Sequence, residues 1–345
     1  MAALSLAYMF WLVFSASGQV LEFVAYGDWG DATRGLKDTI ASIKRRSPNR
    51  AFNLLLGDNF YPKGVSSVDD PKFAIFTDIV LGDTQLVHHM LLGNHDYMSD
   101  ASAQIEYSNV NKYWDLPSRY YKRVYFEEAF AVCLIMLDTS RWDSAQVSWV
   151  EEQLASAECD PRSSWTIVSG HYPIWSAGEY KDRPYLKSDL LPLLHKYGVQ
   201  LYLSGHEHLH EVFYDGSLVQ VTSGAVCGPR DKAKFKPHPL LIWGLSGGPE
   251  VIGYVLIQIT TVYIGIEIVS SVNDADFVSF AITRSGNMES MFGHIDWSST
   301  KNYSASDLFA TGAPTNYPTS VSSPKLARTV VPITVLIFLF IVVVS

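Results

Sequence analysis

Short apolar runs alternate with amphipathic stretches between residues 21 and 204. The apolar runs are LEFVAY (21–26), AFNLLL (51–56), QLVHHMLL (85–92), AFAVCLIML (129–137), WTIVS (165–169) and VQLYLS (199–204). Runs of this length with almost no polar interruption are typical of buried strands. The stretches between them predict helices over residues 32–45, 71–80, 101–109, 144–157 and 186–197. This strand–helix rhythm predicts an α/β sheet flanked by helices.

The pattern changes to strands and turns between residues 212 and 297. In EVFYDGSLVQVTSG, an Asp-Gly pair separates two extended segments, which is a strong hairpin signal. Further strands are predicted within residues 254–271 and 277–283. An α/β part followed by a mostly β part predicts two β-sheets packed together in one domain.

Both ends of the chain are more apolar than its middle. Residues 1–18 combine an apolar run with small residues before Gly18, as a secretory signal peptide does. Residues 325–345 end in TVVPITVLIFLFIVVVS, which predicts a GPI-attachment signal or, alternatively, a single membrane anchor. The Ser-, Thr- and Pro-rich segment 302–324 predicts a solvated stalk, and Asn302 begins the sequence's N-x-S/T glycosylation signal.

Composition restricts the class of protein and of partner. The chain has 345 residues, of which 48% are hydrophobic, so it can form a sizeable core. A formal net charge of −9 without a basic stripe argues against nucleic acid as a partner. Cys133, Cys159 and Cys227 allow at most one internal disulfide, and the sequence leaves its pairing open.

Polar side chains with metal-binding chemistry follow five of the apolar runs directly. The motifs are GDWG (27–30), GDNFY (57–61), GNHD (93–96), GHYP (170–173) and GHEH (205–208). The carboxyl ends of strands in an open α/β sheet form the crevice where ligands bind. A glycine before each polar residue permits a tight turn there. One Gly-Asp turn has no significance, but five such strand ends in succession predict a shared site.

The donors at these ends suit two metal ions rather than one. They are Asp28, Asp58, Tyr61, Asn94, His171, His206 and His208. Seven oxygen and nitrogen donors exceed a tetrahedral site but are enough for two ions that share a carboxylate. Two ions at one edge suit phosphoester hydrolysis, in which they stabilise the attacking and leaving oxygens. The cysteines lie at none of these positions, which argues against a zinc-thiolate site.

With these motifs the chain resembles the metallophosphoesterases, and within them the small purple, or tartrate-resistant, acid phosphatases. The resemblance covers residues 21–285 and includes GDWG, GDNFYPKGV, GNHD followed by SAQIEYS, GHYPIWS and GHEH. It implies the calcineurin-like fold: two mixed β-sheets packed as a sandwich, flanked by helices, with a dinuclear metal site at the strand ends. The phosphatase domain would span residues 19–301. Tyr61 is the most specific residue, because the purple enzymes use this tyrosine to bind Fe(III).

The resemblance also implies a role for each site residue. Fe(III) would be held by Asp28, Asp58, Tyr61 and His208. The second ion, Fe(II), Zn(II) or Mn(II), would be held by Asp58, Asn94, His171 and His206, with Asp58 as the bridge. A metal-bound hydroxide would attack the phosphorus of a phosphate monoester. His95 would protonate the leaving alkoxide or orient the substrate, with Asp96 as a partner for its ring.

Two features depart from the resemblance. Vertebrate members carry a long exposed loop after a strand like 129–137, whereas residues 138–143 here lead almost directly into a predicted helix. Regulation by cleavage of that loop is therefore not expected. The cysteines of the family's disulfide have no counterparts here.

The resulting prediction is an acid phosphatase that acts on small phosphomonoesters or phosphoproteins. Its expected location is the secretory pathway, at the outer face of a membrane or in a lysosome or vacuole. A phosphatase-like scaffold is the first alternative, since some membrane-anchored relatives, such as gliding-motility-associated proteins of apicomplexan parasites, keep the fold with degraded ligands. A phosphodiesterase or nucleotide pyrophosphatase on the same fold is the second, and Tyr61 argues against it.

Overall fold

The computed structural model describes residues 20–290, apart from 83, 230–234 and 285–286, together with 303–304. The predicted signal peptide (1–18), the stalk and terminal tail (302–345, apart from 303–304) and the glycosylation site Asn302 therefore lie outside the described residues. Within the described ranges, no helix has both the length and the apolar character needed to cross a membrane.

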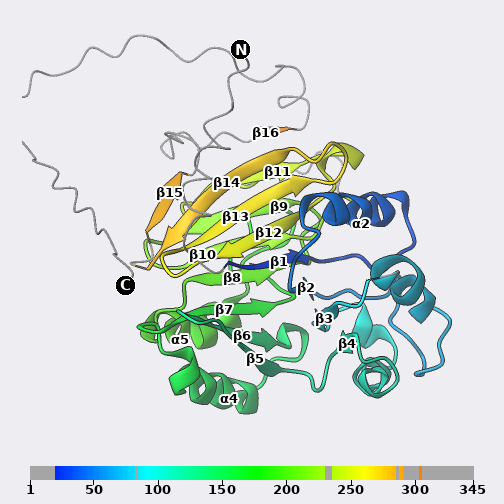
Figure 1. The fold of residues 1–345 in the computed structure, drawn as a ribbon, viewed down its shortest axis with the longest axis horizontal. Helices are drawn as coiled ribbons and strands as arrows, with labels where there is room; N and C mark the ends of the chain where they lie inside the picture. Colours follow the sequence, from blue (N-terminus) through cyan, green and yellow to red (C-terminus); the bar gives the residue numbers. More distant parts are fainter. Residues whose placement is uncertain (1–19, 83, 230–234, 285–286, 291–302, 305–345) are drawn as a thin grey trace, which may run out of the picture.

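Two mixed eight-stranded sheets pack face to face (Figure 1). The first has the order β15-β14-β13-β12-β1-β2-β3-β4 and the second β16-β11-β9-β10-β8-β7-β6-β5. The strands of the first sheet are β1 (Leu21–Tyr26), β2 (Phe52–Leu55), β3 (Val87–Met90), β4 (Trp114–Asp115), β12 (Gly253–Ile259), β13 (Tyr263–Ser270), β14 (Asp276–Thr283) and β15 (Met288–Ser290). Those of the second are β5 (Tyr121–Phe126), β6 (Ala131–Leu137), β7 (Ser164–Gly170), β8 (Leu201–Ser204), β9 (His210–Tyr214), β10 (Val219–Ser223), β11 (Leu241–Ser246) and β16 (Tyr303–Ser304).

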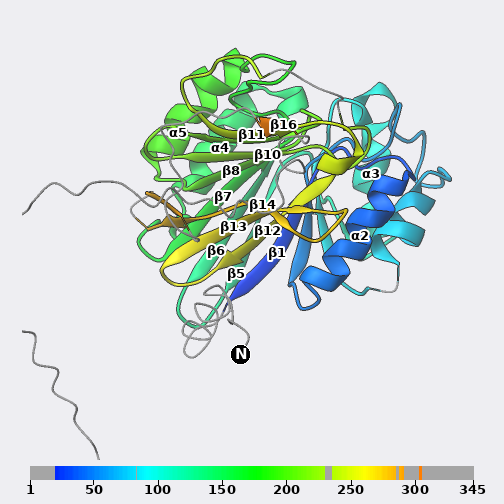
Figure 2. The same ribbon diagram turned by 90° about the horizontal axis from the view of Figure 1, so that it is seen from above.

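Helices cover the two outer sides of the sandwich. Figure 2 shows α2 and α3 on one side and α4 and α5 on the other. The helices are α2 (Arg34–Arg46), α3 (Ala101–Glu106), α4 (Ser144–Leu154) and α5 (Leu191–Lys196), with π-helical turns at Ile75–Leu81 and Leu186–Leu190. Short 3₁₀ turns lie at Asp96–Met98, Tyr107–Asn109, Thr139–Arg141, Ala157–Cys159 and Pro249–Val251. Each helical stretch predicted from the sequence thus has a helical counterpart.

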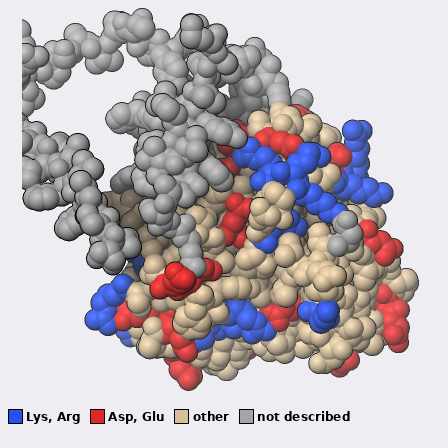
Figure 3. Space-filling view, viewed as in Figure 1, with Lys and Arg blue, Asp and Glu red and all other residues tan. Residues whose placement is uncertain are grey.

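The α2 helix illustrates how local sequence sets an element's bounds. The Thr33 side chain accepts a hydrogen bond from the Leu36 N–H and so caps the first turn. Lys44, Arg45 and Arg46 occupy the last turn, where positive charge is favourable. Lys and Arg gather over this helix in Figure 3. Arg46 pairs with acidic residues of β13 and β14, and Arg45 pairs with Asp274 in the turn between these strands, so part of that charge is compensated.

Two apolar layers hold the domain together. The larger lies between the sheets and continues beneath α2, with Phe23, Phe52 and Trp114 fully buried in it. The smaller lies between the second sheet and the helices α4 and α5, and includes Val150 and Leu194. Burial of both faces of the central strands explains why their sequences are apolar without alternation.

The division of strands between the sheets differs from the sequence prediction. The six strands of the α/β part do not share one sheet: β1–β3 lie in the first and β6–β8 in the second. The β-rich part is likewise divided, because β12 pairs with β1 whereas β10 pairs with β8. The predicted hairpin at residues 212–223 is present as β9 and β10. Apolar character predicts that a strand is buried but not which strand lies beside it.

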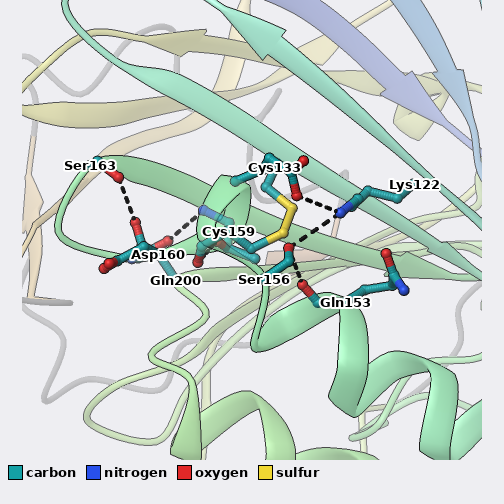
Figure 4. Close-up of a disulfide and its surroundings, with 10 residues drawn as sticks. Lys122, Cys133, Gln153, Ser156, Cys159, Asp160, Ser163 and Gln200 are labelled. Carbon is teal, nitrogen blue, oxygen red and sulfur yellow. Dashed lines mark hydrogen bonds and ion pairs between the residues drawn. A yellow bond between two sulfur atoms is a disulfide. The ribbon is translucent and has the colours of Figure 1, made fainter.

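A disulfide joins Cys133 in β6 to Cys159 in the turn after α4 (Figure 4). Both residues are buried, and Cys227 is a free buried cysteine. The bond closes a loop of 26 residues across one side of the second sheet. It therefore links β6, the strand next to the edge strand β5, to the turn that follows α4.

Replacing Cys133 and Cys159 together by alanine should lower the free energy of unfolding by about 3 kcal/mol, because a closed loop of this length limits the unfolded chain. Denaturant unfolding of the oxidised protein measures the change. Cys227→Ala is the matched control, since it removes a buried thiol without opening a bridge. An equal loss in the single and the double variant would contradict a contribution from the disulfide.

Candidate metal centre

The site lies where parallel strands of both sheets end. In the first sheet β1, β2 and β3 run parallel, and in the second β7 and β8 do, so each set ends at one edge. Backbone hydrogen bonds join the loops that follow: Asp28 N–H donates to Gly57 O, and Gly205 N–H donates to His171 O. The sandwich therefore brings five separate loops to one place, as the sequence motifs predict.

Three of the expected ligands have unusual backbone conformations. Among the described residues, positive φ outside glycine occurs at Asp28 (57°), Asp58 (52°), His206 (68°) and Asp274 (60°). Left-handed backbone is costly for residues with a Cβ and is concentrated at functional sites. The tight turns were expected at the preceding glycines, but at all three of these loops the ligand residue itself takes the left-handed conformation, and of the preceding glycines only Gly57 does so as well.

The first group of donors surrounds the Tyr61 hydroxyl. Tyr61 Oη lies 3.0 Å from Asp28 Oδ1, 3.1 Å from Asp58 Oδ2 and 3.3 Å from His208 Nε2. His208 Nε2 also lies 3.3 Å from Asp28 Oδ1. The four side chains assigned to the first ion therefore converge; we call them lobe one.

The second group converges around His171. His171 Nε2 lies 3.1 Å from Asn94 Oδ1 and 3.4 Å from Asp58 Oδ1. Asp28, Asp58 and His171 also form a group whose ligand atoms all lie within 4.8 Å of one another. We call Asp58, Asn94, His171 and His206 lobe two; the Asp58 carboxylate borders both lobes, as a bridging ligand must.

Backbone carbonyls determine which ring nitrogen of two histidines faces the site. His171 Nδ1 lies 2.8 Å from Leu56 O, and His208 Nδ1 lies 2.8 Å from Gly228 O. A carbonyl oxygen only accepts, so each Nδ1 carries a proton and donates it. In the neutral rings Nε2 then presents a lone pair to the lobes, which is the usual orientation of histidine ligands to metals.

These donors suit bound cations. Asp28 and Asp58 are buried, and within the described residues neither carboxylate has a Lys or Arg within 4 Å. Oxygen and nitrogen lone pairs that converge on the same space repel one another unless a cation lies between them. The phenol and two carboxylates of lobe one suit a hard trivalent ion, and the imidazole and amide of lobe two suit a divalent one.

Without metal, the lobes hold protons instead. Burial would lower the pKa of His208, but the hydrogen bond and charge of Asp28 outweigh burial and raise it to about 9. Burial raises the pKa of the Tyr61 phenol far above its ordinary value, and the charges of Asp28 and Asp58 raise it further. Burial and the Asp28 charge raise the pKa of Asp58.

Metal binding to lobe one should therefore release protons. Below pH 9 the metal-free His208 keeps its proton, so a cation must displace it, together with the Tyr61 proton. The affinity should fall at least about tenfold for each pH unit between pH 8 and pH 6. Calorimetric titration in buffers of different protonation enthalpy counts the protons released. Binding without proton release would contradict this description of lobe one.

His95 lies at the border of the site. Its ring is partly exposed, with Nδ1 2.6 Å from Pro62 O and Nε2 3.9 Å from Asp58 Oδ2. Because Pro62 O accepts, Nδ1 carries the proton in the neutral ring, and Nε2 is the atom that can take up and release another. This placement is compatible with the expected proton transfer to a leaving group.

Asp96 does not have the position expected of it. Its buried carboxylate accepts hydrogen bonds from the backbone N–H groups of Asn59 and Gly93 and from Gln104 Nε2, not from the His95 ring. Burial and the nearby Asp58 charge raise its pKa to about 7. Asp96 is therefore a positioning residue that joins the loop after β2 to the loop after β3. The resemblance implied a contact with the His95 ring, which the turn prevents.

The structure also shows supporting residues that the sequence analysis missed. The buried amide of Asn59 accepts from Trp29 Nε1 and donates to Leu91 O and to Gln104 Oε1. Asn59 and Gln104 lie within the motifs GDNFY and SAQIEYS, so their presence beside ligands was the available signal. Arg183, which contacts His206, lies outside every motif, and no sequence signal identifies it.

Comparisons with known proteins agree with this arrangement. Residues 21–210 match the calcineurin-like phosphoesterase family model. The chain is 34% identical over 240 residues to human tartrate-resistant acid phosphatase type 5, covering 59% of this chain and 72% of that protein. It is 31% identical to purple acid phosphatase 17 of Arabidopsis thaliana, covering 59% and 68% of the two chains.

Solved structures share the fold. GAP50, described as the anchor in the inner membrane complex of Plasmodium, superposes with a TM-score of 0.67 at 24% identity, over 75% of this chain and 87% of that one. A purple acid phosphatase from yellow lupin superposes with a TM-score of 0.59 at 17% identity, over 77% and 54%. Sequence and fold together show that this chain belongs to the calcineurin-like phosphoesterase family, with tartrate-resistant and purple acid phosphatases as its relatives.

Proposed function

We propose that this protein is an acid phosphatase that hydrolyses phosphate monoesters at a dinuclear centre of Fe(III) and a divalent metal. The observation that carries the proposal is the Tyr61 hydroxyl, which lies within 3.3 Å of three further lobe-one donors. A phenol in this place distinguishes the purple acid phosphatases from other members of the family. When bound, two cations polarise the phosphoryl oxygens and lower the pKa of an attacking water.

The protein's own residues supply the remaining steps. Asp58 borders both lobes and would therefore be a ligand shared by the two cations. The partly exposed His95 ring offers Nε2 to the leaving oxygen of a substrate, while Pro62 O holds the opposite side of the ring. Small phosphomonoesters and phosphoproteins are the proposed substrates.

Hydrolysis of p-nitrophenyl phosphate near pH 5, with and without tartrate, tests the proposal. Turnover that tartrate does not inhibit, and that exceeds the rate on bis(p-nitrophenyl) phosphate, is the expected result. A higher rate on the diester would instead support a phosphodiesterase.

The identity of the first metal has a separate test. Bound Fe(III) should produce a visible charge-transfer absorption from the Tyr61 phenolate. Tyr61→Phe should abolish that absorption, because it removes the phenolate oxygen. Iron-loaded protein with the same visible spectrum in both forms would contradict the assignment of Tyr61.

A non-catalytic anchoring role is the second candidate function. Its support is the contact of Arg183 with His206, an expected ligand, together with the fold shared with a protein described as a membrane-complex anchor. Metal-loaded protein that turns over neither monoesters nor diesters would favour this role.

The proposed location is the secretory pathway. The Cys133–Cys159 disulfide supports it, because such bonds persist mainly in oxidising compartments. Quantifying free thiols in protein isolated from cells tests this part: one free thiol supports it, and three contradict it.

A further inference from the structure

Within the described part of the chain, His206 is the one expected metal ligand with a ring nitrogen in contact with an arginine or lysine side chain. Arg183 Nη2 lies 2.7 Å from His206 Nε2. The other two histidine ligands contact a backbone carbonyl through Nδ1 and offer Nε2 to the lobes. The His206 ring lies beside that of His171, with ring centroids 5.2 Å apart, but its Nε2 is taken by the guanidinium. Lobe two therefore has three donors that converge, Asp58, Asn94 and His171. Its fourth donor, His206, is hydrogen-bonded to the guanidinium of Arg183.

Hydrogen-bond chemistry makes this contact incompatible with metal binding by His206. A guanidinium group only donates, so Nε2 must accept with its lone pair, and the ring proton then lies on Nδ1. Neither nitrogen is left with a free lone pair. If a metal instead took Nδ1, the proton would move to Nε2 and point at an N–H of Arg183. In either case the guanidinium must move before His206 can bind a cation.

The surroundings of Arg183 stabilise its present position. Its guanidinium carbon lies 4.1 Å from the centre of the Tyr172 ring, within the range of a cation–π contact. The His206 ring is held from two sides, stacked on Tyr180 at 4.2 Å and edge-on to Tyr172 at 4.4 Å. Arg183 is thus placed by the same aromatic rings that place His206.

Arg183 has no alternative partner in the described residues. It forms no ion pair there, and its Nε is buried without a hydrogen bond. Within the described residues, which leave out 230–234, the contacts of Tyr61, Asp28 and His208 of lobe one include no arginine. Among the described side chains, the guanidinium that contacts an expected ligand is therefore that of Arg183, and the ligand belongs to lobe two.

We propose that Arg183 gates the second metal position by competing with the metal for His206. The inference rests on the proposed dinuclear function and concerns the order and strength of loading. Lobe one binds its cation first, whereas lobe two binds weakly because loading requires displacement of the guanidinium. Removal of Arg183 therefore strengthens the second binding event and leaves the first almost unchanged.

Calorimetric titration of the metal-free protein with Zn²⁺ at pH 7 tests this directly, and elemental analysis gives the stoichiometry. The wild type should bind one ion tightly and a second weakly. Arg183→Met should raise the affinity for the second ion at least about tenfold, since it removes a charged hydrogen-bond donor from His206. The Met side chain keeps much of the length that packs against Tyr172.

Lys187→Met is the matched control. It removes the same charge from the same segment, but Lys187 pairs with Asp182 and has no contact with His206. An equal gain in the control, or no gain in Arg183→Met, overturns the proposal while leaving the phosphatase function intact. Binding of no ion by any form overturns the proposed function instead. Arg183→Leu, which also lacks a hydrogen-bond donor, repeats the test if the Met variant does not fold, provided that its thermal unfolding profile matches the wild type.

Discussion

Asp58→Ala is expected to lower kcat/KM for p-nitrophenyl phosphate by about 10³-fold or more, because stabilisation by bound cations contributes several kcal/mol. The Asp58 carboxylate borders both lobes, with Oδ2 3.1 Å from Tyr61 Oη and Oδ1 3.4 Å from His171 Nε2. Its loss removes a ligand from both cation positions at once. Steady-state kinetics together with metal content by elemental analysis measure the effect.

The fold should survive this change, which makes the kinetic result interpretable. Asp58 is a buried carboxylate whose pKa is raised by burial and by Asp28, so its removal relieves charge repulsion in the metal-free protein. Asp58→Asn keeps the side-chain volume and tests the role of the charge alone. Asp70→Ala, on the exposed 66–72 loop, is the control for an aspartate that lies outside the site. Retained metal and activity in both Asp58 variants would refute the bridging role.

His95→Ala is expected to have the second-largest effect, lowering kcat by about 10²-fold to 10³-fold, as loss of a general acid does. The effect should depend on the leaving group. An alkyl phosphate such as β-glycerophosphate needs protonation of its leaving oxygen, whereas p-nitrophenolate is stable without it. The loss should therefore be much larger for β-glycerophosphate.

Comparing the two substrates separates proton transfer from simple substrate positioning. Equal losses on both substrates would mean that His95 only orients the phosphate. His195→Ala is the matched control, because His195 is a partly exposed histidine that pairs with Asp215 away from the metal centre. Metal content should remain unchanged in both variants, since neither ring belongs to a lobe.

The strand ends were predictable because strand and ligand are adjacent in sequence. Apolar runs mark buried strands, and the residue directly after a parallel strand must lie at its carboxyl edge. This reasoning placed Asp28, Asp58 and His171 at one edge, where they lie within 4.8 Å of one another. The spacing between Asp58 and Tyr61 also placed the phenol in the same loop as the Asp58 carboxylate.

Contacts between distant segments were not predictable in this way. Asp96 and His95 are neighbours in the chain, yet the turn directs Asp96 into a buried network with Asn59, Gly93 and Gln104. Arg183 lies 23 residues before His206 and follows no motif, so only the packing of Tyr172 and Tyr180 brings them together. The division of β1–β3 and β6–β8 between two sheets is of the same kind, because strand pairing depends on long-range packing.

The sequence by itself thus determined which segments form buried strands, which side chains are the site's donors, and that these donors lie at the carboxyl ends of the strands. All three follow from the local pattern and from adjacency in the chain. The tertiary structure decided which ligand lone pairs converge on a common space and which already accept a hydrogen bond from another side chain. Those relations depend on angles and distances between loops that are far apart in the chain. The contrast between His208, which faces lobe one, and His206, which Arg183 holds, arises only in the folded domain.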